Sequence, residues 1–200
     1  MPPIKELYSY YKTLLDYYPE VQTPSGLNRL EICLAVLSGP AKIKTTRVRA
    51  LAGFLASEAQ VAATQMTVEF DAASGAIRLA DPQLTFLADL EADELRRRLI
   101  AWRGIGPESA DALLLHAFDA PVFAVNSRSW RLLRRHGFVG PEADYEEMRE
   151  LFQAALPEDT DIYRRYYRRI TLLGKDFCRS AKFLCSSCPL KPYMEYEPCD

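Results

Sequence analysis

Apolar side chains recur at intervals of three or four residues along most of this chain. That spacing places them on one face of an α-helix, so the pattern predicts a helical protein. In one stretch the pattern alternates instead, where Val68–Phe70 and Ile77–Leu79 flank Ala-Ser-Gly and predict a β-hairpin, to which we assign no function. The predicted helices lie at residues 4–18, 27–37, 41–56, 84–90, 91–100, 107–117, 128–135, 145–155 and 162–173.

The turn Gly104-Ile105-Gly106-Pro107 joins two of these helices. Glycine allows positive φ, and proline suits the first turn of a helix. Exposed glycine amides at a helix start form an anion-binding concavity, although two such glycines are also typical of an ordinary turn.

Positive charge is concentrated around this turn. The whole chain has a formal net charge of −2, whereas residues 96–135 hold eight arginines and no lysine against three acidic residues. This concentration favours phosphate binding over an ordinary turn.

Two later helices carry opposite charges. Residues 141–161 hold eight acidic residues and a single arginine, whereas residues 162–173 contain four arginines. These arginines either pair with the acidic helix or border a DNA groove.

The overall composition is that of an ordinary globular protein, with 48% hydrophobic and 26% charged residues. No apolar run approaches the length of a membrane span, and the first residues lack the apolar stretch of a secretory signal. We therefore expect a cytoplasmic protein with no membrane partner.

Four of the five cysteines lie close together near the end of the sequence, at Cys178, Cys185, Cys188 and Cys199. In a reducing compartment this clustering favours a metal site over disulfides. Four thiolates bind either a zinc ion or a [4Fe–4S] cluster, so the spacing alone is compatible with both. The fifth, Cys33, is expected to be a small buried thiol.

Three motifs together resemble the endonuclease III (HhH-GPD) superfamily of DNA glycosylases, which act in base excision DNA repair. They are G-I-G-P-E-S-A-D-A-L-L-L-H-A-F from Gly104, P-V-F-A-V-N-S-R-S-W-R-L-L-R-R from Pro121, and the first three clustered cysteines with the Pro189-Leu190 that follows. The resemblance is nearest to the endonuclease III-like 3-methyladenine glycosylases, whose hairpin helix also reads E-S-A-D. It covers residues 84–199 well and 27–38 weakly.

This resemblance implies an all-α fold in which two helical lobes flank a DNA-binding cleft. One lobe would span residues 27–135 and hold a helix-hairpin-helix motif at about 95–118. The other would combine residues 1–26 and 136–200 and hold an iron–sulfur cluster loop at 178–199.

The resemblance also implies site residues. It favours a [4Fe–4S] cluster over zinc, although the family's last gap is five or six residues and the gap before Cys199 is ten. It implies a monomer that binds double-stranded DNA, damaged or undamaged. The implied DNA-binding residues are Gly104, Ile105, Gly106, Ser109 and Arg128.

Two positions depart from the family's catalytic pattern. Asn126 stands where the family has an Asp that stabilises an oxocarbenium-like sugar, and an amide cannot ionise. Glu108 stands where bifunctional relatives have a Lys that attacks the sugar as a Schiff base, and it supplies no amine. The family's Gln-containing loop is also replaced, by S-G-P-A from Ser38.

We therefore predict a DNA-binding protein of this family that recognises damaged bases, with little or no lyase activity and impaired glycosylase activity. One alternative is an active monofunctional glycosylase whose acid is Glu108 or Asp111. A second is an active enzyme into which Asn126 was introduced. A third, unrelated alternative is a small helical metal protein that binds another protein through its acidic helix.

Overall fold

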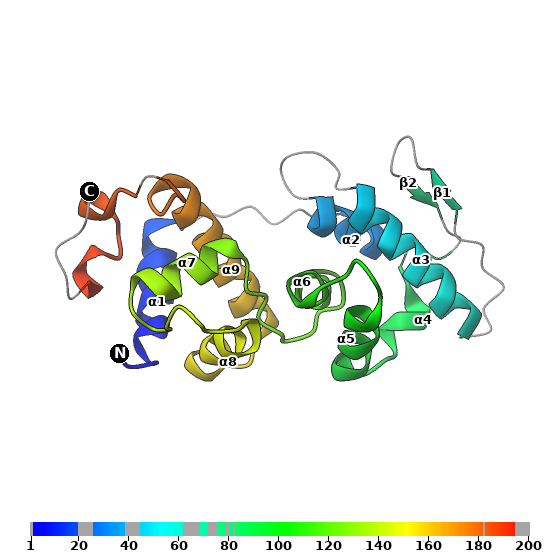
Figure 1. Cartoon of the computed structure of the whole chain (residues 1–200), viewed down its shortest axis with the longest axis horizontal. Coiled ribbons are helices and arrows are strands. Elements are labelled where there is room, and N and C mark those ends of the chain that lie inside the picture. Colours follow the sequence, from blue (N-terminus) through cyan, green and yellow to red (C-terminus); the bar gives the residue numbers. More distant parts are fainter. Residues whose placement is uncertain are drawn as a thin grey trace. The chain divides into compact units, whose positions relative to one another are not determined.

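The chain folds into nine α-helices, one two-stranded hairpin and two 3₁₀ turns within the residues that the structure describes (Figure 1). The predicted helical fold is confirmed, and so is the predicted hairpin, in which β1 (Glu69–Asp71) pairs antiparallel with β2 (Ala76–Arg78). Within the residues that the structure describes, no helix is long and apolar enough to cross a membrane. The structure is a computed structural model that describes residues 2–19, 26–38, 45–61, 69–71, 76–78, 81, 83–181 and 183–194.

Two compact units make up the chain. One is Pro24–Ala120, and the other joins Met1–Thr23 to Pro121–Asp200. Residues 121–135 were predicted to belong to the first lobe, whereas they belong to the second unit, because helix α7 (Ser127–Arg135) packs on α9 (Thr160–Asp176). The predicted DNA-binding cleft stays a prediction.

In the unit Pro24–Ala120, α6 packs on α2 and α5 (Figure 1). Every residue of α6 from Ser109 to Leu115 is buried. Arg29 ties the end of α6 in place by donating to the carbonyl of Ala117 at 2.7 Å. The helices of this unit are α2 (Arg29–Ser38), α3 (Thr45–Val61), α4 (Thr85–Ala88), α5 (Ala92–Ala101) and α6 (Pro107–Ala117).

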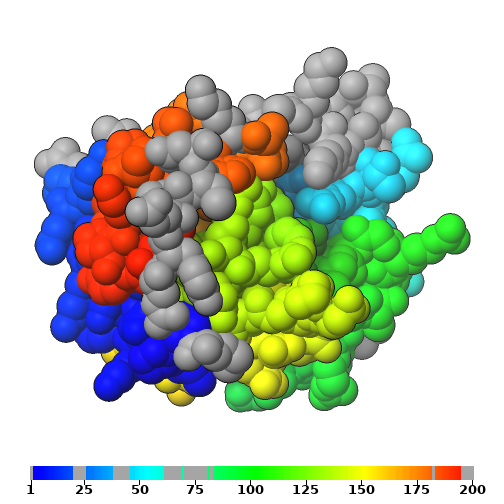
Figure 2. All heavy atoms as spheres, turned by 60° about the vertical axis from the view of Figure 1, so that its left-hand side comes forward, coloured from blue at the N-terminus to red at the C-terminus, as the bar shows by residue number. Residues whose placement is uncertain are grey.

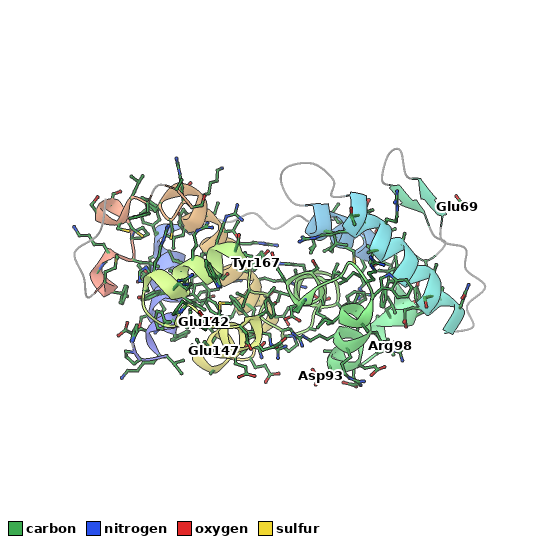
Figure 3. All side chains as sticks on the ribbon, in the orientation of Figure 1. Glu69, Asp93, Arg98, Glu142, Glu147 and Tyr167 are labelled. Atoms are coloured by element: carbon green, nitrogen blue, oxygen red, sulfur yellow. The ribbon has the colours of Figure 1, made fainter. Side chains whose placement is uncertain are left out.

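An ion pair joins α3 to α5 in the same unit. Arg98, labelled in Figure 3, donates to Glu58 at 2.7 Å and to Glu94 at 2.6 Å. Surface pairs of this kind contribute modestly to the free energy of unfolding.

The other unit has an aromatic core around α9. Phe123 stacks on Phe152 with ring centroids 4.2 Å apart, and the ring of Tyr166 packs edge-on against both. The predicted acidic surface helix is confirmed as α8, because Phe152 is buried whereas Glu147 is exposed (Figure 3). Besides α7 and α9, this unit contains α1 (Glu6–Tyr17), α8 (Tyr145–Ala155) and the 3₁₀ turns η1 (Cys185–Ser187) and η2 (Lys191–Tyr193).

Candidate functional site

The turn between α5 and α6 requires glycine at Gly104. Its φ is +102°, and a Cβ atom at this position would lie 2.9 Å from the Cβ of Ala50 in α3. The amide of Ile105 closes the turn by donating to the carbonyl of Trp102 at 3.1 Å. Another residue at Gly104 would therefore be strained both in its backbone and against α3.

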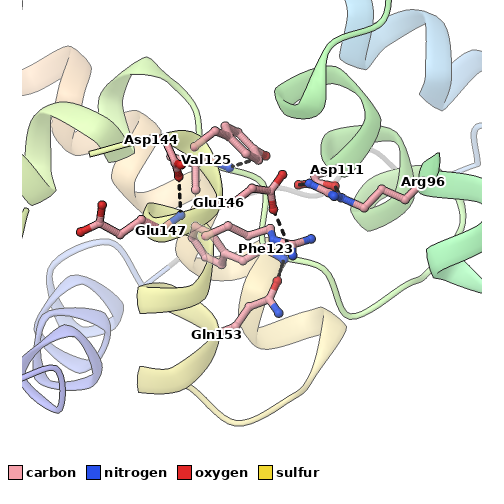
Figure 4. Close-up of polar contacts among 10 residues, drawn as sticks. Arg96, Asp111, Phe123, Val125, Asp144, Glu146, Glu147 and Gln153 are labelled. Atoms are coloured by element: carbon pink, nitrogen blue, oxygen red, sulfur yellow. Dashed lines mark hydrogen bonds and ion pairs between the residues drawn. The ribbon is translucent and has the colours of Figure 1, made fainter. Parts of the chain in front are cut away.

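Among the residues that the structure describes, no side chain caps the start of α6. Gly106 is its N-cap residue and Pro107 its first residue, so the amides of Glu108 and Ser109 receive no capping hydrogen bond. With the positive end of the helix dipole, these amides can attract an anion. The starts of α1, α4 and α5 also lack a side-chain cap, whereas those of α7, α8 and α9 are capped by the side chains of Asn126, Asp144 (Figure 4) and Asp159.

The predicted DNA-binding residues of the hairpin differ in exposure. Gly104 and Gly106 are exposed, whereas Ile105 and Ser109 are buried. Ile105 and Ser109 can therefore offer a ligand little beyond their backbone groups. The remaining predicted residue, Arg128, belongs to the other unit.

The two acidic candidates on α6 lie in opposite environments. Glu108 is exposed, whereas Asp111 is completely buried. Arg96 of α5 binds both carboxylate oxygens of Asp111, with nitrogen–oxygen distances of 2.6 and 3.2 Å (Figure 4). Asp111 is thus the buried partner of the half-buried Arg96, and of the two acids it is Glu108 that solvent can reach.

Asn126 caps α7 from a buried position. Its Oδ1 accepts hydrogen bonds from the amides of Arg128 at 2.8 Å and Ser129 at 3.0 Å. The residue is only 5% exposed. Asparagine is among the best N-cap residues, which gives this amide a structural role in the fold.

The nitrogen of the same amide is also engaged. Because the two capping groups are obligate donors, Oδ1 must face them, and Nδ2 then donates to Oγ1 of Thr171 on α9 at 3.3 Å. Thr171 in turn donates to the carbonyl of Tyr167 at 2.9 Å (Tyr167 is labelled in Figure 3). Nothing in the sequence pointed to Thr171, because no local motif links it to a residue 45 positions away.

The arginines of α7 have different partners. Arg131 donates to the carbonyl of Cys178 at 3.2 Å, and Arg135 donates to Sγ of Cys178 at 3.1 Å and to the carbonyl of Arg179 at 2.9 Å. The Arg128 guanidinium has no hydrogen bond or ion pair with any residue that the structure describes. Arg131 and Arg135 therefore hold the cysteine loop, the segment that carries Cys178, Cys185 and Cys188.

Three of the four predicted metal ligands line one small pocket beside α7 and α9. They are Cys178, Cys185 and Cys188, and burial together with the two neighbouring thiols raises the pKa of Cys188 to about 11. The thiol donors suit an iron–sulfur or zinc site in their chemistry. Within the described residues, however, no three ligating side chains are close enough to form a metal-binding group. Cys199 lies outside the described residues.

The N-terminal helix supports the cysteine loop. The hydroxyls of Thr13 on α1 and Tyr193 in η2 lie 2.8 Å apart, and the rings of Tyr10 and Tyr193 are 4.8 Å apart. Figure 2 shows the η2 segment in red against the blue helix. Tyr10 also hydrogen-bonds Nδ1 of His136 at 2.9 Å, and burial, with a smaller effect of Arg135, lowers the pKa of His136 to about 4. The loop is thus held by α1 as well as α7.

Comparison with known proteins finds sequence relatives over about half of the chain, and no family model matches it. A Methanocaldococcus jannaschii protein named as a candidate DNA repair glycosylase is 39% identical over 99 residues, which is 50% of this chain and 44% of that protein. Endonuclease III of Sulfolobus acidocaldarius is 29% identical over 108 residues, or 54% of this chain and 48% of that protein. The chain therefore spans about half the length of these curated relatives. Over that half it is homologous to endonuclease III-like DNA glycosylases.

Solved structures extend the likeness to the whole chain at the level of fold. A trapped covalent intermediate of endonuclease III with DNA matches with a TM-score of 0.63 and 17% identity, covering 98% of this chain and 97% of that one. A non-covalent endonuclease III–DNA complex matches with a TM-score of 0.58 and 14% identity, covering 98% and 96%. The helical fold is therefore that of endonuclease III.

Proposed function

We propose that this chain is a DNA-binding protein of the endonuclease III-like base excision repair family. It recognises damaged bases in double-stranded DNA, with little or no lyase activity and impaired glycosylase activity. The proposal rests on the hydrogen bonds of Asn126. Its side-chain oxygen caps α7, and its side-chain nitrogen donates to Thr171. A group engaged in this way, and unable to ionise, supplies no negative charge to a developing sugar cation.

DNA binding is proposed to use the turn at Gly104 and the uncapped start of α6. Backbone phosphate contacts of this type are salt-dependent and carry little sequence selectivity. Gly106→Asp would place a negative charge beside a phosphate and should lower the affinity for duplex DNA at least tenfold. Gly140→Asp is the matched control, because Gly140 is also exposed and has open space around a Cβ atom. Equal affinity in both variants would exclude this turn as the DNA contact.

Catalysis is tested at Asn126. The Asn126→Asp variant keeps the shape of the side chain and restores one negative charge, so base release from damaged duplexes should rise without tighter duplex binding. Duplexes with 3-methyladenine test the branch suggested by E-S-A-D, beside other lesions. Strand cleavage should stay absent in both proteins, because Glu108 supplies no amine.

The rival proposal is an active monofunctional glycosylase whose acid is Glu108, which is exposed at the start of α6. Robust base release by the unaltered protein that disappears in Glu108→Gln would establish this rival. No base release by Asn126→Asp on any lesion would instead support a protein that only binds DNA.

We also propose that Cys178, Cys185, Cys188 and Cys199 hold a [4Fe–4S] cluster. Three of the thiols line one pocket, and Arg131 and Arg135 hold the backbone and sulfur of Cys178. When bound, the cluster would cross-link the loop and so stabilise it against α7. Protein purified without oxygen should be brown and contain iron and acid-labile sulfide. Colourless protein with one zinc ion per chain would contradict the proposal.

A further inference from the structure

Helices α7 and α9 cross at Gly174. A Cβ atom at this position would lie 2.6, 2.7 and 2.9 Å from Cδ, Cγ and Cβ of Arg128. Real Cβ atoms do not tolerate such distances, so any larger residue would displace the Arg128 side chain. Gly174 lies inside α9, where glycine is less favourable than alanine by about 1 kcal/mol. Glycine is therefore required here because it leaves room for the aliphatic stem of the Arg128 side chain.

This crossing constrains Arg128 at two points. Its amide donates to Oδ1 of Asn126, which fixes the backbone at the start of α7, and its aliphatic stem lies across Gly174. The guanidinium beyond the stem has no partner among the residues that the structure describes. A charged group that is held in this way loses little rotamer entropy when it binds a ligand.

The charges next to the crossing suit an anion. Lys175 is exposed directly after Gly174, and the nearest carboxylate in the sequence, Asp176, accepts a hydrogen bond from Tyr18 at 2.9 Å. Arg131, one turn further along α7, adds a second guanidinium beside the cysteine loop. A phosphate group, with several oxygens that accept the fork of an arginine, matches this arrangement.

We propose that Gly174 is a positioning residue, which holds the Arg128 guanidinium in place to bind a phosphate of the DNA backbone. The inference rests on the proposed DNA-binding function. Gly174 itself touches no DNA in this arrangement and acts through Arg128.

The test is the salt dependence of duplex binding. Loss of one phosphate contact lowers the slope of log K against log salt by about one. Arg128→Gln and Gly174→Ala should each produce this loss, whereas Gly140→Ala, an exposed glycine with open space around a Cβ atom, should not. Arg134→Gln removes the same charge from the same helix, where the guanidinium stacks on Trp130, and should also leave the slope unchanged.

The double variant Arg128→Gly/Gly174→Ala separates positioning from general damage to the fold, because Arg128→Gly removes the three atoms that would clash. It should fold, and its slope should equal that of Arg128→Gly alone. A further loss of slope in the double variant would overturn the inference, as would an unchanged slope in Gly174→Ala or an equal loss in Arg134→Gln.

The Gly106→Asp variant distinguishes failure of this inference from failure of the proposed function. If Gly106→Asp abolishes binding while Gly174→Ala and Arg128→Gln bind normally, the roles of Arg128 and Gly174 are excluded and the proposed DNA binding at the Gly104 turn stands. If the unaltered protein shows no salt-dependent duplex binding, the proposed function and this inference both fail.

Discussion

At the scale of single residues, Asn126 has a structural role that is separable from any chemical one. Its Oδ1 accepts two backbone hydrogen bonds at the start of α7, and its Nδ2 reaches Thr171. An aspartate could provide the same cap and would complement the helix dipole. Its second oxygen would, however, face a hydroxyl that already donates to Tyr167, so Thr171 would have to rotate.

Substitutions at Asn126 should therefore differ in their effect on stability. Asn126→Ala removes the cap and leaves buried amides without acceptors, so the free energy of unfolding should fall by about 1–2 kcal/mol. Asn126→Asp should change it by less than about 1 kcal/mol, because the cap is retained. Urea unfolding of the three proteins measures both values, and a neutral Asn126→Ala would contradict the capping role.

A second residue-scale prediction concerns Cys33. Burial raises the pKa of its thiol to about 12, so the thiolate that reacts with disulfide reagents is absent at pH 8. In native protein without metal, Cys33 should stay unlabelled until the chain unfolds, and Cys33→Ala should remove that slow thiol alone. Because the folded-state pKa is raised, this thiol favours the folded state less as pH rises from about 9 towards 12. Rapid labelling of Cys33 in the native state would contradict its burial.

At the scale of elements, the sequence predicted where the helices lie more reliably than which of their faces are buried. The nearly all-apolar run at residues 27–37 is typical of a buried helix, but α2 is buried along one face only: Leu30, Cys33 and Leu37 are buried, whereas Glu31 is exposed. A nearly continuous apolar run hides this periodicity. The alternation in the β-hairpin was correctly predicted, with Phe70 opposite Ile77, because a period of two differs clearly from that of a helix.

The turn between α5 and α6 offers an element-scale prediction. Gly104→Ala forces a residue with a Cβ atom to φ near +102° and against Ala50, so the free energy of unfolding should fall by about 1–3 kcal/mol. Gly140→Ala is the control and should change it by less than about 0.5 kcal/mol. Thermal unfolding of both variants checks the difference, and equal melting temperatures would show that the turn adapts.

At the scale of the whole molecule, the chain builds one unit from its two ends. Met1–Thr23 joins Pro121–Asp200, and the contacts of Thr13 and Tyr10 with Tyr193 connect α1 to the loop that carries the cysteines. The unit Pro24–Ala120 contains the turn at Gly104 and takes no part in these contacts. Loss of metal should therefore affect the two units differently.

Metal removal tests this division. After oxidative removal of the proposed cluster, hydrogen exchange should accelerate in residues 183–194 and in α1, because Tyr193 links them. Amides of α6, which α2 and α5 cover, should keep their protection. The measurement is exchange detected by mass spectrometry before and after removal. Equal acceleration in both units would show that the cluster supports the whole chain.

The sequence by itself determined the helical segments, the hairpin turn at Gly104 and the cysteine pattern, because each depends on neighbours within a few positions. Its resemblance to the glycosylases also predicted that Asn126 stands in place of their catalytic acid. Tertiary structure alone decided the partners of these residues. Asp111 pairs with Arg96 and Asn126 with Thr171 across 15 and 45 positions, and Gly174 makes room for Arg128. Such contacts arise where two helices cross, and the crossing is set by the packing of whole faces, which no local spacing encodes.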